Sequence, residues 1–194
     1  NFGLEKIAHH LLNACVAHGA DSARLVLLGE TLAGVNQELL VFNAGSSGEV
    51  YKDMDRIILE QIKEEPVVVI PSKARIKRLV TEKGVPIPTA LAGWSIRDGN
   101  VLFGLLWIAY DQSHRFQDEE IRFLNTIAGQ AALAVSNAGL YLKAEVGKQR
   151  LEPVLASTPE AVLVVNDEDS LIIANQAAQQ VEGLVEGDEE GSPG

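Results

Sequence analysis

The stretch from Thr89 to Tyr110, TALAGWSIRDGNVLFGLLWIAY, decides the fold of this chain. Two apolar segments flank Arg97-Asp98-Gly99-Asn100, and the Asp-Gly pair supplies the positive φ that a tight hairpin turn requires. We therefore predict a hairpin with strands at 89–96 and 101–110. Because hairpin strands pair with each other, the sheet that contains them is at least partly antiparallel.

A long helix is predicted after the hairpin, from Asp118 to at least Ala144. Three carboxylates follow Gln117, the expected N-cap, and they lie where the positive end of the helix dipole favours them. Alanines and Gly129 fill the middle of its apolar stripe, which permits close approach by another element. Most globular helices are shorter, so we expect a second copy of the chain to pack on this stripe, making a homodimer with contacts at Leu124, Ala128, Ala131, Val135, Ala138 and Leu142.

The residues before the hairpin alternate between helical and strand patterns. Apolar spacing predicts helices at 4–18, 53–64 and 72–82, and strands at 23–28, 38–42 and 67–70, with a loop at 43–48. This order predicts an α+β sandwich with a mainly antiparallel central sheet and the first and last helices packed on one face. After Pro153 the pattern restarts, with strands at 161–165 and 171–174 and a short helix capped by Asn175.

The composition limits the classes of function. The net charge of −11 and pI near 4.8 argue against general nucleic-acid binding, which needs a basic face. A single cysteine excludes an internal disulfide and fits the cytoplasm. No apolar run approaches the roughly 18–20 residues that cross a bilayer, so no membrane contact is expected. The first residue is not methionine, which suggests a piece of a longer protein.

The passage Gly104-Leu105-Leu106-Trp107-Ile108, followed by Phe116-Gln117-Asp118-Glu119-Glu120, resembles the "G-V-L-x-L … F-[ST]-x-[ED]-[DE]" passage of GAF domains. This resemblance covers about residues 4–143. From Leu151 the chain resembles the beginning of a PAS domain, on residues 155–162 and 173–178. Together, the two resemblances imply a GAF-like sensory domain with its signalling helix at 1–148 and an incomplete PAS-like segment at 149–182. Residues 183–194 are rich in Gly and Glu and predicted to be disordered.

The GAF resemblance implies a ligand pocket between the sheet and the central helices that cover it. Candidate pocket residues are apolar or aromatic residues in the strands and the second helix: Phe42, Tyr51, Ile57, Trp94 and Ile96. The alternative is that all of these fill the core. A basic run offers anion contacts at Lys73, Arg75 and Lys77, and its alternative is a solvated helix face that balances nearby glutamates.

No catalytic or metal-binding residues are predicted. The spacing of His9, His10, His18 and His114 fits no zinc site, and haem is disfavoured. Cys15 lies in the first helix, away from the expected pocket, which disfavours a covalent bilin and a GAF-type methionine sulfoxide reductase. We expect a non-catalytic sensory module that resembles the input half of bacterial sensor kinases of two-component systems. The alternatives are a ligand-free dimerisation spacer and a small enzyme.

Overall fold

The computed structural model describes residues 2–31, 38–167 and 171–180. The chain forms two compact units, residues 1–142 and residues 143–194, and each is described by itself. The segment predicted to be disordered, 183–194, lies outside the described residues. The first unit contains α1 (Phe2–Ala17), β1 (Ser22–Leu28), η1 (Gly29–Thr31), β2 (Leu39–Gly45), α2 (Met54–Glu64), β3 (Val67–Ile70), α3 (Lys73–Leu79), β4 (Ala90–Asp98), β5 (Val101–Tyr110) and the first part of α4 (Asp118–Ser157).

The centre of the first unit is a five-stranded sheet in the order β2-β1-β5-β4-β3. Every neighbouring pair in it is antiparallel. The predicted hairpin is confirmed, because β4 pairs with β5 and Asp98 lies opposite Val101. Gly99 takes a φ of 54° in the turn, a conformation that glycine adopts without steric cost. The predicted α+β class is therefore confirmed.

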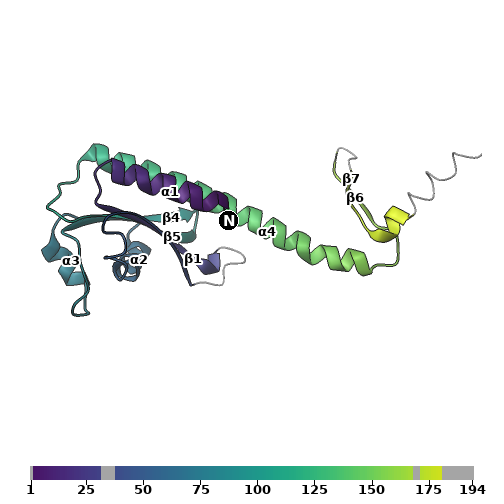
Figure 1. The fold of residues 1–194 in the computed structure, drawn as a ribbon, viewed down its shortest axis with the longest axis horizontal. Coiled ribbons are helices and arrows are strands. Elements are labelled where there is room, and N and C mark those ends of the chain that lie inside the picture. Colours follow the sequence, from purple (N-terminus) through teal and green to yellow (C-terminus); the bar gives the residue numbers. More distant parts are fainter. Residues whose placement is uncertain (1, 32–37, 168–170, 181–194) are drawn as a thin grey trace, which may run out of the picture. The chain divides into compact units, whose positions relative to one another are not determined.

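One face of the sheet is covered by α1 and the first part of α4, which lie side by side (Figure 1). Leu12 and Cys15 of α1 and Leu124 and Val135 of α4 share one buried cluster with sheet residues such as Leu106. Because side chains alternate along a strand, the neighbours of Leu106 point to the other side. The prediction that the first and last helices pack on one face is confirmed.

The other face is covered by α2 and α3 (Figure 1). Ile58 of α2 and Ile76 of α3 are fully buried against Val26, Leu105 and Trp107 of the central strands. The central strands β1 and β5 are thus buried on both faces, which explains their nearly continuous apolar sequence.

Gly104 shows why the quoted motif begins with glycine. Its φ is 155°, and a Cβ built there would lie 2.0 Å from the carbonyl oxygen of Val26 on β1. Any side chain would push β5 away from β1 at this position. Glycine is therefore required by the close pairing of the two central strands.

The second unit begins inside α4. The sequence pattern predicted a restart at Pro153, but the helix continues through it to Ser157. Proline removes only one backbone donor, and this one lies one turn from the end of the helix, where the hydroxyls of Ser157 and Thr158 donate to the carbonyl of Val154. β6 (Leu163–Val165) and β7 (Leu171–Ala174) follow as an antiparallel pair.

Asn175 organises this second unit. Its Oδ1 accepts the backbone N–H of Ala178 at 3.0 Å, which confirms the predicted N-cap of the helix at 176–180. The same oxygen accepts the N–H of Val162, while Nδ2 lies within hydrogen-bond distance of the carbonyls of Leu155, Thr158 and Glu160. One buried amide therefore joins the end of α4, the strand pair and the short helix.

Candidate functional site

The α2/α3 face contains a buried ion pair. Arg24 on β1 is 3% exposed and Asp55 on α2 is 4% exposed. Two hydrogen bonds join them, from Arg24 Nε to Asp55 Oδ1 at 2.8 Å and from Nη2 to Oδ2 at 2.6 Å. Trp107 Nε1 also donates to Asp55 Oδ1 at 2.8 Å, and Arg24 Nη1 donates to the carbonyl of Gly48. The opposite charges of the carboxylate and the guanidinium therefore compensate each other in the buried interior. Their two hydrogen bonds also hold the first turn of α2 against β1.

A second polar cluster anchors the loop before α2. The carboxylate of Asp111 accepts the hydroxyl of Ser47 at 2.7 Å and that of Tyr51 at 2.6 Å. Burial, and then the hydrogen bond to Asp111, raise the pKa of Tyr51, so its hydroxyl stays protonated and donates. The loop is thus tied to the end of β5 from one side and to Arg24 from the other.

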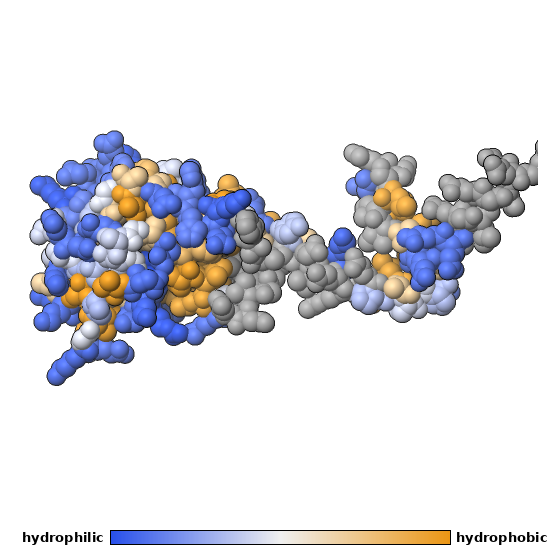
Figure 2. Space-filling model, in the orientation of Figure 1, coloured by the Kyte–Doolittle hydropathy of each residue, from blue (hydrophilic) through white to orange (hydrophobic). Residues whose placement is uncertain are grey.

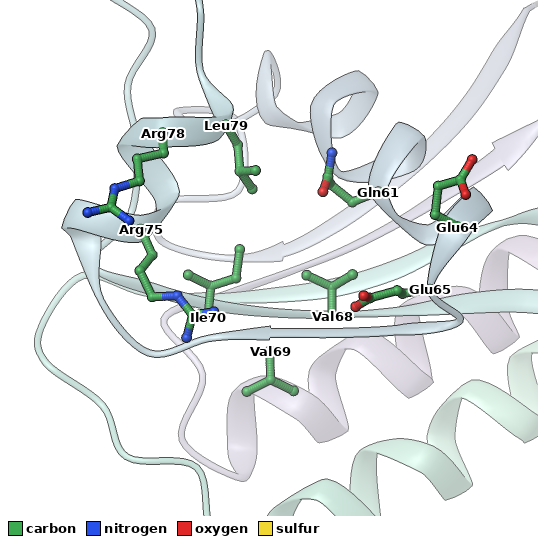
Figure 3. Close-up of a pocket in the computed structure, with 9 residues that line it drawn as sticks. All are labelled: Gln61, Glu64, Glu65, Val68, Val69, Ile70, Arg75, Arg78 and Leu79. Carbon is green, nitrogen blue, oxygen red and sulfur yellow. The ribbon is translucent and has the colours of Figure 1, made fainter.

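A cleft of about 330 Å³ lies beyond the C-terminal end of α2, between α2, α3 and the edge strand β3 (Figure 3). Val68 and Ile70 form its apolar floor, and Leu79 contributes from α3. Gln61 extends from α2 above Val68, with its amide directed toward α3 (Figure 3). Charged residues surround this apolar centre: Glu64 and Glu65 at the end of α2, and Arg75 and Arg78 on α3.

Another cleft, of about 290 Å³, lies at the N-terminal end of α2. Its lining includes Ile57 and Leu39 together with the buried carboxylate of Asp55. Arg56 stands at this cleft and pairs with the exposed Glu38 at 2.9 Å. Both clefts are therefore on the same face of the sheet, at opposite ends of one helix.

The structure does not bring the five candidate pocket residues together. Trp94 and Ile96 are buried in the α1/α4 face, where Trp94 Nε1 donates to Asn125 of α4 at 2.6 Å, and Phe42 packs partly buried against the same cluster. Tyr51 and Ile57 lie on the α2/α3 face. Trp94 and Ile96 share a side because side chains alternate along β4. Alternation gives no information on which helices cover that side. The tryptophan that faces α2 is Trp107.

The three basic residues predicted to contact an anion are not brought together either. Arg75 lines the cleft at the end of α2, together with Arg78, whereas Lys73 and Lys77 are exposed and do not line it. The charged residue that sequence reasoning missed is Arg24. Its signal was an arginine inside the otherwise apolar strand Ala23–Leu28, where a buried position requires a charged partner.

The predicted dimer stripe is used inside the first unit. Leu124, Ala128, Ala131 and Val135 are buried against its sheet and α1, and Ala138 packs partly buried on the same cluster. The side chain of Leu142 lies outside the described ones. Because α4 covers its own sheet with this stripe, the four buried side chains are not available to a second copy. Among the side chains that the structure describes in this part of α4, the large exposed apolar ones are Leu133 (64%), Leu140 (63%) and Tyr141.

The reactive residue types are held in structural roles. Burial raises the pKa of the Cys15 thiol to about 12, so at neutral pH it is protonated and poorly nucleophilic. His114 stacks on Tyr110 with ring centroids 3.6 Å apart, and its Nε2 lies 2.8 Å from Glu120 Oε2. The hydroxyl of Tyr110 also donates to Glu120, and the backbone N–H of Gln117 lies 3.4 Å from the same carboxylate. Glu120 therefore caps the N-terminus of α4.

Within the described ranges, no three His, Cys, Asp or Glu side chains gather as metal ligands. The same ranges hold no helix that is both long and apolar enough to span a membrane.

The fold is similar to that of solved GAF domains. The GAF domain of an Acinetobacter phosphoenolpyruvate-protein phosphotransferase matches at 17% identity with a TM-score of 0.53, covering 70% of this chain and 92% of that one. A domain of a putative two-component sensor histidine kinase from Sinorhizobium meliloti matches at 20% identity and a TM-score of 0.50, covering 75% and 96%. The photoproduct state of a GAF domain, GAF3, of a Synechocystis protein matches at 14% identity and 0.51, covering 74% and 98%.

These identities are low and support the fold alone, and no curated relative matches the chain. The family model described as GAF domain matches residues 4–135, which is more than half of the chain. The chain therefore belongs to the GAF domain family.

Proposed function

We propose that the chain is a non-catalytic sensory module of a larger cytoplasmic signalling protein of the bacterial sensor-kinase type. In this proposal it binds a small ligand on the α2/α3 face and passes the change along α4. The observation that carries it is the extent of α4, which packs on the sheet of the first unit through residues such as Leu124 and continues as one helix to Ser157. A helix that belongs to both units is suited to transmit a shift in packing from one to the other.

Residues 149–182 would be the start of a PAS-like domain that receives the signal. Support comes from the antiparallel pair β6 and β7 and from Asn175, which lies in the PAS-like stretch at 173–178 and caps the helix that follows β7. The amide of Asn175 also reaches the carbonyl of Leu155 near the end of α4. A displacement of α4 would therefore act directly on the hydrogen bonds of this segment.

The relay is tested by breaking α4 between the two parts. Ala144→Pro removes a backbone donor and costs about 3 kcal/mol of helix stability at that point. We expect a ligand that raises the unfolding temperature of the first unit in the unmodified chain to change hydrogen exchange at β6 and β7 as well. In the Ala144→Pro chain the thermal shift should persist and the exchange effect should disappear. An exchange effect that survives the substitution would contradict the relay.

In the same proposal the chain acts as a homodimer, through a surface different from the predicted stripe. The second copy would pack on the exposed side chains Leu133 and Leu140 of α4, together with Ile7, an exposed apolar residue of α1. Orange patches on the visible face of the first unit show that its surface is not uniformly polar (Figure 2). Burying each leucine would contribute about 1.5–3 kcal/mol.

Sedimentation tests the dimer. We expect the double variant Leu133→Ser and Leu140→Ser to be monomeric at concentrations where the unmodified chain is dimeric. Val101→Ser, which removes an exposed apolar side chain from β5, is the matched control and should leave the dimer intact. A chain that is already monomeric at high concentration, or a double variant that still dimerises, would contradict this interface.

The ligand-free spacer remains the second candidate because Trp94 and Ile96 fill the core instead of lining a cavity. A thermal-shift panel of cyclic nucleotides, haem and common metabolites separates the two functions. A ligand that binds only the folded state stabilises it by about 2.7 kcal/mol at a hundredfold excess over its Kd. If no panel member raises the unfolding temperature, the spacer is favoured.

A further inference from the structure

The cleft between α2, β3 and α3 has opposite charges at its two ends. Arg75 and Glu65 extend toward the apolar floor of Val68 and Ile70 from opposite sides, while Arg78 and Glu64 stand at the outer rim (Figure 3). Val69, between the two floor residues, points to the other side of β3 (Figure 3). The cleft therefore consists of a positive end, an apolar middle and a negative end.

These charges do not neutralise one another. In the part of the chain that the structure describes, none of Glu65, Arg75 and their rim neighbours Glu64 and Arg78 belongs to an ion pair. Elsewhere on α2, Arg56 and Lys63 do find carboxylate partners. The acidic end of the cleft lies at the C-terminus of α2, where Glu65 is the C-cap. The negative end of the helix dipole therefore adds to the attraction of this end of the cleft for a cation.

The floor sets the separation of the charges. Val68 and Ile70 are two positions apart on a strand, which places them roughly 6.6 Å from each other at about 3.3 Å per residue. An α-amino acid carries both charges next to one carbon atom and is too short to reach both ends. A ligand that satisfies both ends must have its charges separated by an apolar chain.

We propose that this cleft binds a small zwitterion whose ammonium and carboxylate stand at opposite ends of an apolar chain, as in an ω-amino acid or a short apolar peptide. The carboxylate accepts hydrogen bonds from Arg75, the ammonium donates to Glu65, and the apolar middle covers Val68 and Ile70. The amide of Gln61 lies above this middle and suits the peptide group of a dipeptide (Figure 3). This inference deepens the proposed sensory function and rests on it.

The first test is calorimetric titration of the whole chain with three probes of similar length: ε-aminocaproate, caproate and hexylamine. Caproate lacks the ammonium and hexylamine lacks the carboxylate. Because a hydrogen bond to a charged group is worth more than a neutral one, we expect the zwitterion to bind at least about tenfold more tightly than either half. Equal affinity for the three probes, or no binding of ε-aminocaproate and of the dipeptide dileucine, overturns the proposal. Tighter binding of dileucine than of ε-aminocaproate identifies a peptide as the ligand, and the reverse identifies an ω-amino acid.

Charge reversal provides the second test. Arg75→Glu alone and Glu65→Arg alone should each weaken binding of the tighter zwitterion by about tenfold or more. The double variant should regain the affinity, because the same ligand can bind in the reversed direction. Lys73→Glu is the matched control, since it lies on the same helix and does not line the cleft. Folded variants in which the double reversal binds as weakly as the single ones would overturn the assignment.

The same samples separate this inference from the function on which it rests. If neither zwitterion binds while another ligand raises the unfolding temperature and alters exchange at β6 and β7, the cleft assignment fails and the sensory function stands. If the zwitterion binds through Arg75 and Glu65 without changing exchange at β6 and β7, the cleft assignment stands and the relay fails.

Discussion

The two faces of the central sheet are built in different ways. On the α1/α4 face, small and branched apolar side chains such as Ala128 and Val135 fill the space between helices and strands. On the α2/α3 face, the core surrounds the buried pair of Arg24 and Asp55, and charged clefts lie at both ends of α2. The first arrangement favours a stiff connection between sheet and helix, because close-packed interiors transmit displacement. The second leaves charge and open volume available to a ligand.

The largest difference between the faces should appear when one partner of the ion pair is removed. Asp55→Ala leaves Arg24 buried without its carboxylate and Trp107 without its acceptor, so we expect a loss of about 3–5 kcal/mol in the free energy of unfolding. Urea denaturation measures it. The combined change Arg24→Met and Asp55→Leu should cost much less, because no unpaired charge remains. Arg56→Ala, which breaks an exposed pair on the same helix, should cost at most about 1 kcal/mol.

On the opposite face, truncation of an apolar side chain should be the costly change. Leu124→Ala removes a buried side chain of α4 and leaves a cavity, with an expected loss of about 2–5 kcal/mol. Gln130→Ala, an exposed position two turns along the same helix, should change the free energy of unfolding by less than about 0.5 kcal/mol. Similar effects of the two substitutions in urea denaturation would show that α4 does not pack on the sheet as described.

Cys15 gives this face a pH dependence. Its thiol has a pKa raised by burial from 9.0 to about 12, so above pH 9 the unfolded chain loses a proton that the folded chain keeps. The stability contributed by this group is complete below pH 9 and falls as the pH rises, by about 1.4 kcal/mol per pH unit. We expect the unmodified chain to lose stability between pH 9 and 10 more steeply than Cys15→Ala does. Parallel stability curves for the two chains would contradict the burial of this thiol.

The smallest expected effect concerns the hydrogen bond between Trp94 of β4 and Asn125 of α4 on the same face. Asn125→Ala removes the acceptor of Trp94 Nε1 and should cost about 1 kcal/mol, measured by urea denaturation. The neighbouring exposed change Thr126→Ala is the control, because the hydroxyl of Thr126 donates only within its own helix. A cost as large as that of Asp55→Ala would remove the distinction between the faces.

Local signals in the sequence predicted most of the elements. The strand at 67–70 was identified with its observed bounds because Pro66 precedes a short run of β-branched residues, and the hairpin followed from Asp98-Gly99. The end of α4 was not predicted, since Pro153 is a strong local signal for a break and only the later hydrogen bonds show that the helix continues. The predicted bounds were most accurate where a turn residue marks the end of an element.

The candidate site was predicted less well, for a physical reason. Periodicity states which residues share a face, but not which helices cover that face, so the sequence could not assign Trp94 to the α1/α4 face and Trp107 to the α2/α3 face. In the same way the stripe from Leu124 to Ala138 was identified as apolar, and the sequence did not reveal that its partner is the domain's own sheet. Arg75 was identified because charge is visible in a sequence. Glu65, which lies across the cleft from Arg75, was considered only as a glutamate that balances the charge of the basic run.

The placement of the two tryptophans gives the molecule a built-in optical readout. Trp94 lies on the α1/α4 face and Trp107 on the α2/α3 face, on adjacent strands, with Gly93 paired to Trp107 and Trp94 paired to Leu106. The chain has no other tryptophan, so a Trp94→Phe chain emits from one side of the sheet and a Trp107→Phe chain from the other. Fluorescence of the two single-tryptophan chains therefore follows the α1/α4 face and the α2/α3 face as separate signals in solution, without any attached dye.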